Sequence, residues 1–94
     1  MNIRRLLLDV DKALQRPSLL EIGEAISNVK GVEGFNIEVA EIDVETVDMN
    51  ITIEGQNLDY GKIQTAIENS GAVVHSIDQL GAGERIITPV KQAR

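Results

Sequence analysis

The sequence predicts an α+β fold with the element order βαββαβ, and three observations support this prediction. Four stretches alternate apolar and polar residues with the period of two that is typical of β-strands. Two other stretches repeat apolar residues at helical spacing, and each of them follows a strand-like stretch. With 94 residues, the chain has room for a single domain, 1–94, whose small core we expect within residues 3–80.

Residues 3–12 are predicted to form the first strand, which ends before Pro17. One face of this strand is apolar and the other is mixed: Leu6, Leu8 and Val10 alternate with Arg5, Leu7, Asp9 and Asp11. A helix follows, because Ser18 and Glu21 have the spacing of a capping box and apolar residues then recur at helical intervals. We expect this helix to end near Lys30, with Gly31 in the left-handed conformation that favours glycine.

The second predicted strand starts near Glu33 and changes its pattern partway along. Its apolar residues occupy odd positions first and even positions afterwards: Phe35, Ile37 and Val39, then Ile42 and Val44. A β-bulge near Ala40 and Glu41, which inserts one residue, would keep both sets on one face. After a turn at residues 45–47, the third strand is predicted to run to Glu54.

The second half of the chain supplies another helix and another strand. The helix is predicted from the apolar stripe Leu58, Tyr60, Ile63 and Ile67. Asn57 or Asp59 is expected to cap its start, and Gly71 its end. The fourth strand is predicted over residues 72–80, where His75 shares a face with apolar neighbours. We therefore expect His75 in the core or at its edge, hydrogen-bonded to a neighbouring group.

The remaining residues, 81–94, are interpreted in two ways. Gly81 and Gly83 break the fourth strand, and Ile86, Ile87 and Pro89 follow them. The segment 84–94 is therefore either a short extra edge strand or a loose tail.

The order βαββαβ is typical of the ferredoxin-like sandwich, a four-stranded antiparallel sheet with both helices on one face. In this topology the first and third strands are central, the second lies beside the third, and the fourth lies beside the first. We expect an ion pair between Arg5 and Asp78 on the first and fourth strands. The second face of the sheet is left open.

Acidic residues dominate the middle of the sequence, because no lysine or arginine lies between Lys30 and Lys62, where eight acids fall. In the predicted topology, acids from three strands converge at one end of the open face. Their oxygen atoms suit a hard cation, Ca²⁺ or Mg²⁺, although no EF-hand loop is present. The candidate metal ligands are Asp9, Asp11, Glu41, Asp43, Glu45 and Asp48. The alternative interpretation is a solvated acidic face that favours solubility and protects a sheet edge.

Composition argues against several classes of partner. The net charge of −6 and the two aromatic residues, Phe35 and Tyr60, do not suit a nucleic-acid binder. Thiolate metal sites and disulfides are excluded, because the chain has no cysteine. No apolar run predicts a signal peptide or a membrane span, so we expect a cytoplasmic protein.

No motif predicts enzymatic activity. The residues Gly81, Ala82 and Gly83 lack the frame of a phosphate-binding loop, and the acids lie on a flat face without an evident pocket. We therefore assign no catalytic residue and no organic cofactor.

Four runs of the sequence carry a resemblance to a known family: KGVEGFNIEVAEIDVET, NITIEG, NLDYGKIQTAIENSG and VVHSID. In this order and spacing they resemble the small archaeal proteins grouped as "domain of unknown function 211", over about residues 3–87. The resemblance implies a ferredoxin-like fold and ring-shaped homo-oligomers, with no established biochemical activity. It also implies divalent metal binding at Asp9, Glu41, Asp43 and Glu45. The segment DKALQRPS departs from the family pattern, and Asp11 stands where the family is expected to have an apolar residue.

The expected function is a non-enzymatic module that assembles with itself and binds Ca²⁺ or Mg²⁺ on its acidic sheet face. The alternative is a small-ligand-binding regulatory module, because ferredoxin-like domains often pair and bind metabolites between subunits. A large particle without a bound metabolite would favour the first, and a ligand retained through purification would favour the second.

Overall fold

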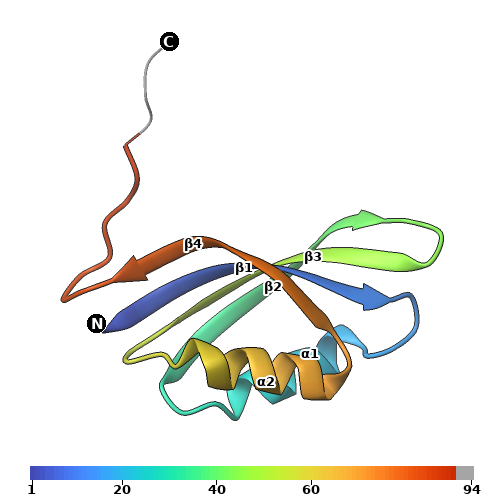
Figure 1. The fold of residues 1–94 in the computed structure, drawn as a ribbon, viewed down its shortest axis with the longest axis horizontal. Coiled ribbons are helices and arrows are strands. Elements are labelled where there is room, and N and C mark those ends of the chain that lie inside the picture. Colours follow the sequence, from blue (N-terminus) through green and yellow to red (C-terminus); the bar gives the residue numbers. More distant parts are fainter. Residues whose placement is uncertain (91–94) are drawn as a thin grey trace.

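The structure is a computed structural model that describes residues 1–90. Its elements follow the predicted order: β1 (Ile3–Ala13), α1 (Leu19–Ser27), β2 (Val32–Ile42), β3 (Thr46–Gly55), α2 (Tyr60–Ser70) and β4 (Val73–Ala82). The strands form one antiparallel sheet in the order β2-β3-β1-β4, and both helices lie on the same face of it (Figure 1). The predicted ferredoxin-like fold is confirmed, with β1 and β3 in the centre and β2 and β4 at the edges.

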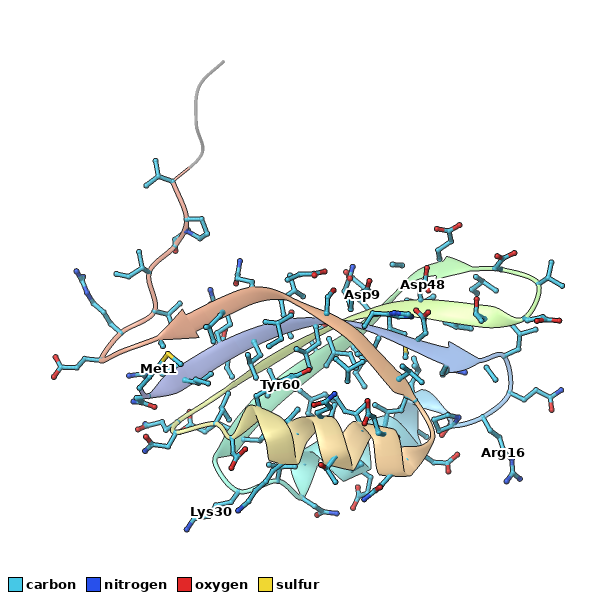
Figure 2. The ribbon with its side chains drawn as sticks, viewed as in Figure 1. Met1, Asp9, Arg16, Lys30, Asp48 and Tyr60 are labelled. Carbon is cyan, nitrogen blue, oxygen red and sulfur yellow. The ribbon has the colours of Figure 1, made fainter. Side chains whose placement is uncertain are left out.

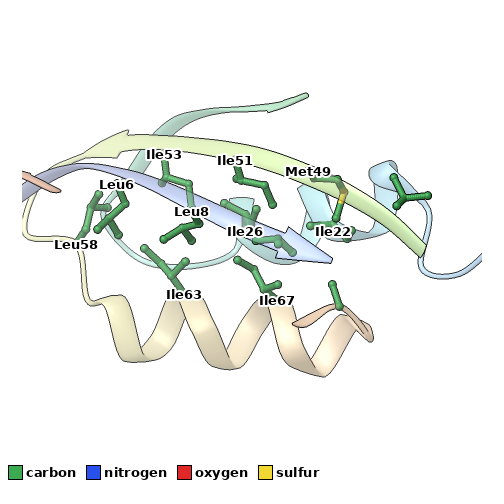
Figure 3. Packing of buried hydrophobic residues seen from close by; sticks show 13 residues of the cluster. Leu6, Leu8, Ile22, Ile26, Met49, Ile51, Ile53, Leu58, Ile63 and Ile67 are labelled. Atoms are coloured by element: carbon green, nitrogen blue, oxygen red, sulfur yellow. The ribbon is translucent and has the colours of Figure 1, made fainter. Parts of the chain in front are cut away.

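The core lies between the two helices and the two central strands (Figure 3). The strands contribute alternate residues of one face, because successive side chains of a strand point to opposite sides. The fully buried side chains include Leu6, Leu8 and Val10 of β1, Met49, Ile51 and Ile53 of β3, Ile22 and Ile26 of α1, and Ile63 and Ile67 of α2. The other face of β1 and β3, which we call the open face, has no helix above it.

Both helices begin as predicted. In the capping box of α1, Ser18 Oγ accepts a hydrogen bond from the amide of Glu21, and Glu21 Oε1 accepts one from the amide of Ser18, both at 3.1 Å. Asp59 caps the start of α2, and Gly71 ends it with a φ of 109°.

The end of α1 differs from the prediction. The helix stops at Ser27, with Asn28 as its C-cap, rather than near Lys30. Gly31, with a φ of 95°, belongs instead to the turn that leads into β2. The carbonyl of Gly31 accepts a hydrogen bond of 3.0 Å from the amide of Gln56, so the turn holds the start of β2 against the end of β3.

The predicted bulge in β2 is confirmed. Val39 pairs with Met49 and Glu41 pairs with Asp48, so Ala40 is the inserted residue. The strand β4 contains irregularities that were not predicted: its pairing with β1 shifts between Leu7 and Leu8 and again between Asp9 and Val10.

Residues 83–90 contain no helix or strand and lead away from the sheet (Figure 1). Arg4 anchors the start of this stretch through a hydrogen bond from Nη1 to the carbonyl of Glu84. Of the two interpretations, the tail therefore holds for residues 84–90, while residues 91–94 lie outside the described part of the chain. Within residues 1–90, no helix has the length and apolar character needed to cross a membrane.

Replacing Gly55 by alanine is expected to destabilise the fold. A Cβ atom at this position would overlap the carbonyl oxygen of Gly31 and lie 3.0 Å from the amide nitrogen of Glu33. We expect the free energy of unfolding, measured by urea denaturation, to fall by about 1–3 kcal/mol or more. Gly34→Ala is the control, because a Cβ there meets no atom within 4 Å. Equal stabilities of the two variants would contradict this account of the turn.

Candidate functional site

The open face gathers four acidic residues from three neighbouring strands. Asp11 of β1 and Glu41 of β2 both pair with Asp48 of β3, which lies between them. Asp9 lies two residues before Asp11, on the same face of β1. Figure 2 shows Asp9 and Asp48 on the side of the sheet away from the helices. We call these four residues, Asp9, Asp11, Glu41 and Asp48, the acidic patch.

The carboxyl groups of the acidic patch interact strongly at Asp48. A side-chain hydrogen bond with Asp11 raises the pKa of Asp48 above its ordinary value of 3.8. Partial burial and the charges of Asp11, Asp9 and Glu41 raise this pKa further. The acidic patch is therefore a place where positive charge, either a proton or a metal cation, is favourable.

His75 also belongs to the open face, so the prediction that it lies in the core or at its edge is wrong. Its Nε2 lies 2.5 Å from Oδ2 of Asp11, and its side chain is 55% exposed. The physical reason is the irregular pairing of β4 with β1, where Val74 pairs with Val10 but Ser76 pairs with Asp9. Between these two pairs, the inserted His75 projects toward Asp11 instead of packing into the core.

The predicted ion pair between Arg5 and Asp78 is wrong as well. Arg5 instead contacts Glu54 of β3, with Nε at 2.9 Å and Nη2 at 2.8 Å from Oε2. The shifts in β4 bring Gly81 opposite Arg5, while the hydroxyl of Ser76 donates a hydrogen bond to Asp78. The partly buried ion pair of Arg5 and Glu54 lies at the other end of the open face from the acidic patch.

Two predicted metal ligands, Asp43 and Glu45, lie outside the acidic patch. Both are exposed residues of the loop that joins β2 to β3. The Oδ1 atom of Asp43 accepts a hydrogen bond of 2.7 Å from the amide of Val44, which fixes the loop. Neither residue is among the groups that raise the pKa of Asp48. The structure thus brings together four of the six predicted ligands and places the other two at the tip of the hairpin.

The chemistry of the acidic patch suits a hard cation, because all of its donor atoms are carboxylate oxygens. Its geometry in a single chain is incomplete. Across residues 1–90, no three acidic or histidine side chains are arranged to hold one metal ion between them. A cation on this face would therefore need other ligands in addition to those that one copy presents.

A second feature is an apolar row on the helix side of the edge strand β2, which was predicted from the sequence, although the exposure of its later residues was not. This β2 apolar row consists of Phe35, Ile37, Val39 and Ile42, which pair with the core residues of β3. Val39 remains 41% exposed and Ile42 66% exposed, although their partners on β3 are buried. The helix α1 has nine residues and is roughly 14 Å long, whereas β2 has eleven residues and spans roughly 36 Å. The helix therefore cannot cover the whole row.

A groove of about 340 Å³ runs between α1 and β2 beside this row. We call it the α1/β2 groove, and Leu19, Leu20, Gly23, Glu24, Ser27, Phe35 and Ile37 line it. Gly23 allows the ring of Phe35 to approach the helix, because a Cβ at this position would lie 2.8 Å from the ring. Leu20 is 85% exposed at the groove edge. The groove thus presents apolar side chains on both walls, with Glu24 at its rim.

The sequence matches a known family along nearly its whole length. The model of the domain of unknown function 211, described as "Uncharacterized ArCR", matches residues 4–94. An uncharacterized protein of Methanocaldococcus jannaschii is 42% identical over 90 residues, which cover 96% of this chain and 92% of that protein. The range matched by the family model contains both the acidic patch and the β2 apolar row.

Replacing Asp48 by asparagine is expected to stabilise the protein at neutral pH. Because the pKa of Asp48 is raised in the folded state, the folded chain holds this proton more tightly than the unfolded chain does. The free energy of unfolding should therefore fall as the pH rises above 3.8 through the raised pKa, and Asp48→Asn should remove this loss. Thermal unfolding from pH 3 to pH 8 measures the difference.

The control for this experiment is Glu45→Gln, which removes one acid outside the patch. We expect its dependence on pH to follow that of the unmodified chain. Parallel curves for all three proteins would show that Asp48 is not under the influence of its acidic neighbours.

Proposed function

The chain belongs to the family named domain of unknown function 211, and we propose that this member is a non-enzymatic module that assembles with copies of itself. In this proposal the subunits meet along the edge strand β2. The observation that carries the proposal is the β2 apolar row, whose later residues, Val39 and Ile42, face the helix side of the sheet but extend beyond the cover of α1. A neighbouring copy supplies the missing cover.

The energetics of the β2 apolar row favour such a contact. Each Val or Ile side chain that becomes fully buried contributes about 1.5–3 kcal/mol to association. Val39 is 41% exposed and Ile42 is 66% exposed, so about half of this free energy is still available. Association must also offset the loss of translational and rotational freedom, which requires several such side chains together with further contacts.

The backbone of β2 supplies those further contacts. As an edge strand, β2 leaves hydrogen-bonding groups along its outer side without a partner strand within residues 1–90. Its eleven residues include no proline and no lysine, which are residues that commonly protect edges. An extended segment of another copy can therefore add to the sheet at this edge.

The difference between the two edges of the sheet supports a ring. The two edges differ, because β2 and β4 lie on opposite sides of the central strands. A contact between the β2 side of one copy and a different surface of the next is heterologous, and heterologous contacts close into rings when the rotation allows it. A ring of identical subunits also agrees with the expectation drawn from the family resemblance.

A divalent cation, Ca²⁺ or Mg²⁺, is the second part of the proposal. The acidic patch includes Glu41 at the β2 edge, where a neighbouring copy would approach. Oxygen atoms of that copy would add to those of Asp11 and Asp48 and complete a set that one chain lacks. The raised pKa of Asp48 supports this part, because the neighbouring carboxylates that disfavour its ionised form would also attract a cation.

Replacing Ile42 by lysine is expected to weaken assembly without unfolding the subunit. The side chain is 66% exposed in the single chain, so the fold tolerates the change, but a charge would be buried in the contact. We expect the dissociation constant of the oligomer to rise on the order of tenfold or more. Native mass spectrometry and light scattering over a dilution series measure it.

Ile42→Val is the matched control, because it keeps the position apolar and should leave the oligomer nearly intact. A monomer at every concentration and ionic condition for the unmodified chain would overturn the proposed assembly. The same mass spectra test the alternative function, since a retained small molecule would appear as additional mass on each subunit.

Millimolar Ca²⁺ or Mg²⁺ is expected to raise the thermal midpoint of the protein. A cation that binds only the folded assembly stabilises it by about 2.7 kcal/mol at a concentration of one hundred times its dissociation constant. Asp48→Asn should reduce this response, whereas Glu45→Gln should keep it. Sodium chloride at the same ionic strength separates specific binding from screening. Equal midpoints with and without divalent cations would exclude the cation from the proposal.

A further inference from the structure

The C-terminal segment, residues 84–94, differs in charge from the rest of the chain. It carries three basic residues, Arg85, Lys91 and Arg94, and one acid, Glu84. Residues 1–83 carry six basic residues and fourteen acids. The segment therefore combines a positive charge with the apolar residues Ile86, Ile87, Pro89 and Val90, in a protein whose body is strongly acidic.

The described part of this segment is anchored at its start and exposed beyond it. Arg4 holds the carbonyl of Glu84, and Ile86 lies near Gly81 of β4. After this point, Ile87 is 63% exposed and Val90 is 90% exposed. The segment therefore presents two aliphatic side chains that its own subunit leaves in water.

The α1/β2 groove has the complementary character. Its walls are apolar, with Leu20 and Phe35 exposed, and Glu24 lies at its rim. The adjoining edge strand β2 carries no basic residue, and it carries Glu33 together with Glu38 and Glu41, which lie on its open face. A basic, apolar and extended segment thus matches the groove in both charge and hydrophobicity.

Other segments of the chain fit this place less well. Pairing of β2 with a second β2 would place three acids of one copy beside three acids of the other, and like charges disfavour such pairing. The edge strand β4 contains Asp78 and no lysine or arginine. Among the segments outside the sheet and helices, the C-terminal segment combines exposed aliphatic residues with net positive charge.

Within one subunit, the C-terminal segment starts at the edge of the sheet opposite to the α1/β2 groove. It leaves from β4, while the α1/β2 groove lies at the β2 edge, three strand spacings or roughly 14 Å away across the sheet. Residues 86–90 also lead away from the body of the subunit (Figure 1). This direction suits contact with a different copy.

We infer that the C-terminal segment of one copy binds in the α1/β2 groove of the next, where Ile87 and Val90 cover the apolar walls. This inference rests on the proposed self-assembly and names the segment that forms the contact. The backbone of the segment would lie along the free edge of β2, which is a common way for extended peptides to bind a sheet. Since donor and acceptor surfaces lie on opposite edges, each copy can give its segment to one neighbour and receive one from another.

Cross-linking tests the contact directly, because the chain has no native cysteine. A chain with Val90→Cys is mixed with a differently tagged chain with Leu20→Cys, and the mixture is oxidised. We expect a disulfide between the two tagged chains. Thr65→Cys, on the exposed side of α2, replaces Leu20→Cys as a control and should give no such product. A chain that carries both Val90→Cys and Leu20→Cys is the second sample. A disulfide that forms within this single chain, and not between chains, would overturn the inference.

A second experiment measures how much the segment contributes to assembly. Ile87→Asp with Val90→Asp should raise the dissociation constant on the order of tenfold or more for each side chain, while Ile87→Val with Val90→Ile should leave it nearly unchanged. If the aspartate variant assembles as tightly as the unmodified chain, the inference is wrong while the proposed self-assembly stands. If the unmodified chain is itself monomeric, the proposed self-assembly fails and the inference fails with it.

Discussion

The two helices are too short to cover the helix side of a sheet whose strands have ten or eleven residues. They bury the central strands β1 and β3 completely on that side, and this contact forms the core. The apolar face of β2 extends beyond the cover that α1 provides, so its later residues remain in contact with water. Apolar surface on an unpaired edge strand is a frequent origin of association between protein chains. The proposed assembly follows from this mismatch in length.

On the open face of the sheet, the unfavourable interaction is electrostatic, because the register of the strands holds like charges close together. In spatial order, Glu41 of β2, Asp48 of β3, Asp11 of β1 and His75 of β4 form a line across all four strands. The contact between His75 and Asp11 offsets part of the repulsion. A bound cation or an approaching basic group would offset more of it. The two faces therefore both favour a partner, one through hydrophobic contact and the other through charge.

The features that follow from local sequence rules were predictable. The capping box of Ser18 and Glu21 and the left-handed cap at Gly71 depend on residues close together in the chain. The bulge at Ala40 was predictable because the apolar pattern of β2 changes from odd to even positions there. The convergence of Asp9, Asp11, Glu41 and Asp48 followed from strand alternation and the topology together.

The position of His75 was not predicted, because its face depends on irregular pairing between β4 and β1. The β4 sequence does carry a signal of these irregularities, since the residues that pair with the core side of β1 switch between even and odd positions: Val74, Ile77 and Leu80. The exposure of the β2 apolar row could not be predicted, because it depends on how far α1 extends along β2 in the folded structure.

The account depends most on the claim that the helix side of β2 is covered by another copy in solution. Hydrogen–deuterium exchange of the β2 amides, measured over a range of protein concentrations, tests this claim most directly. We expect the outer β2 amides, which do not bond to β3, to exchange slowly at high concentration and to lose this protection on dilution, while amides of β1 and β3 stay protected throughout. Rapid exchange of the outer β2 amides at every concentration would contradict the account, because the edge would then be free in the native protein.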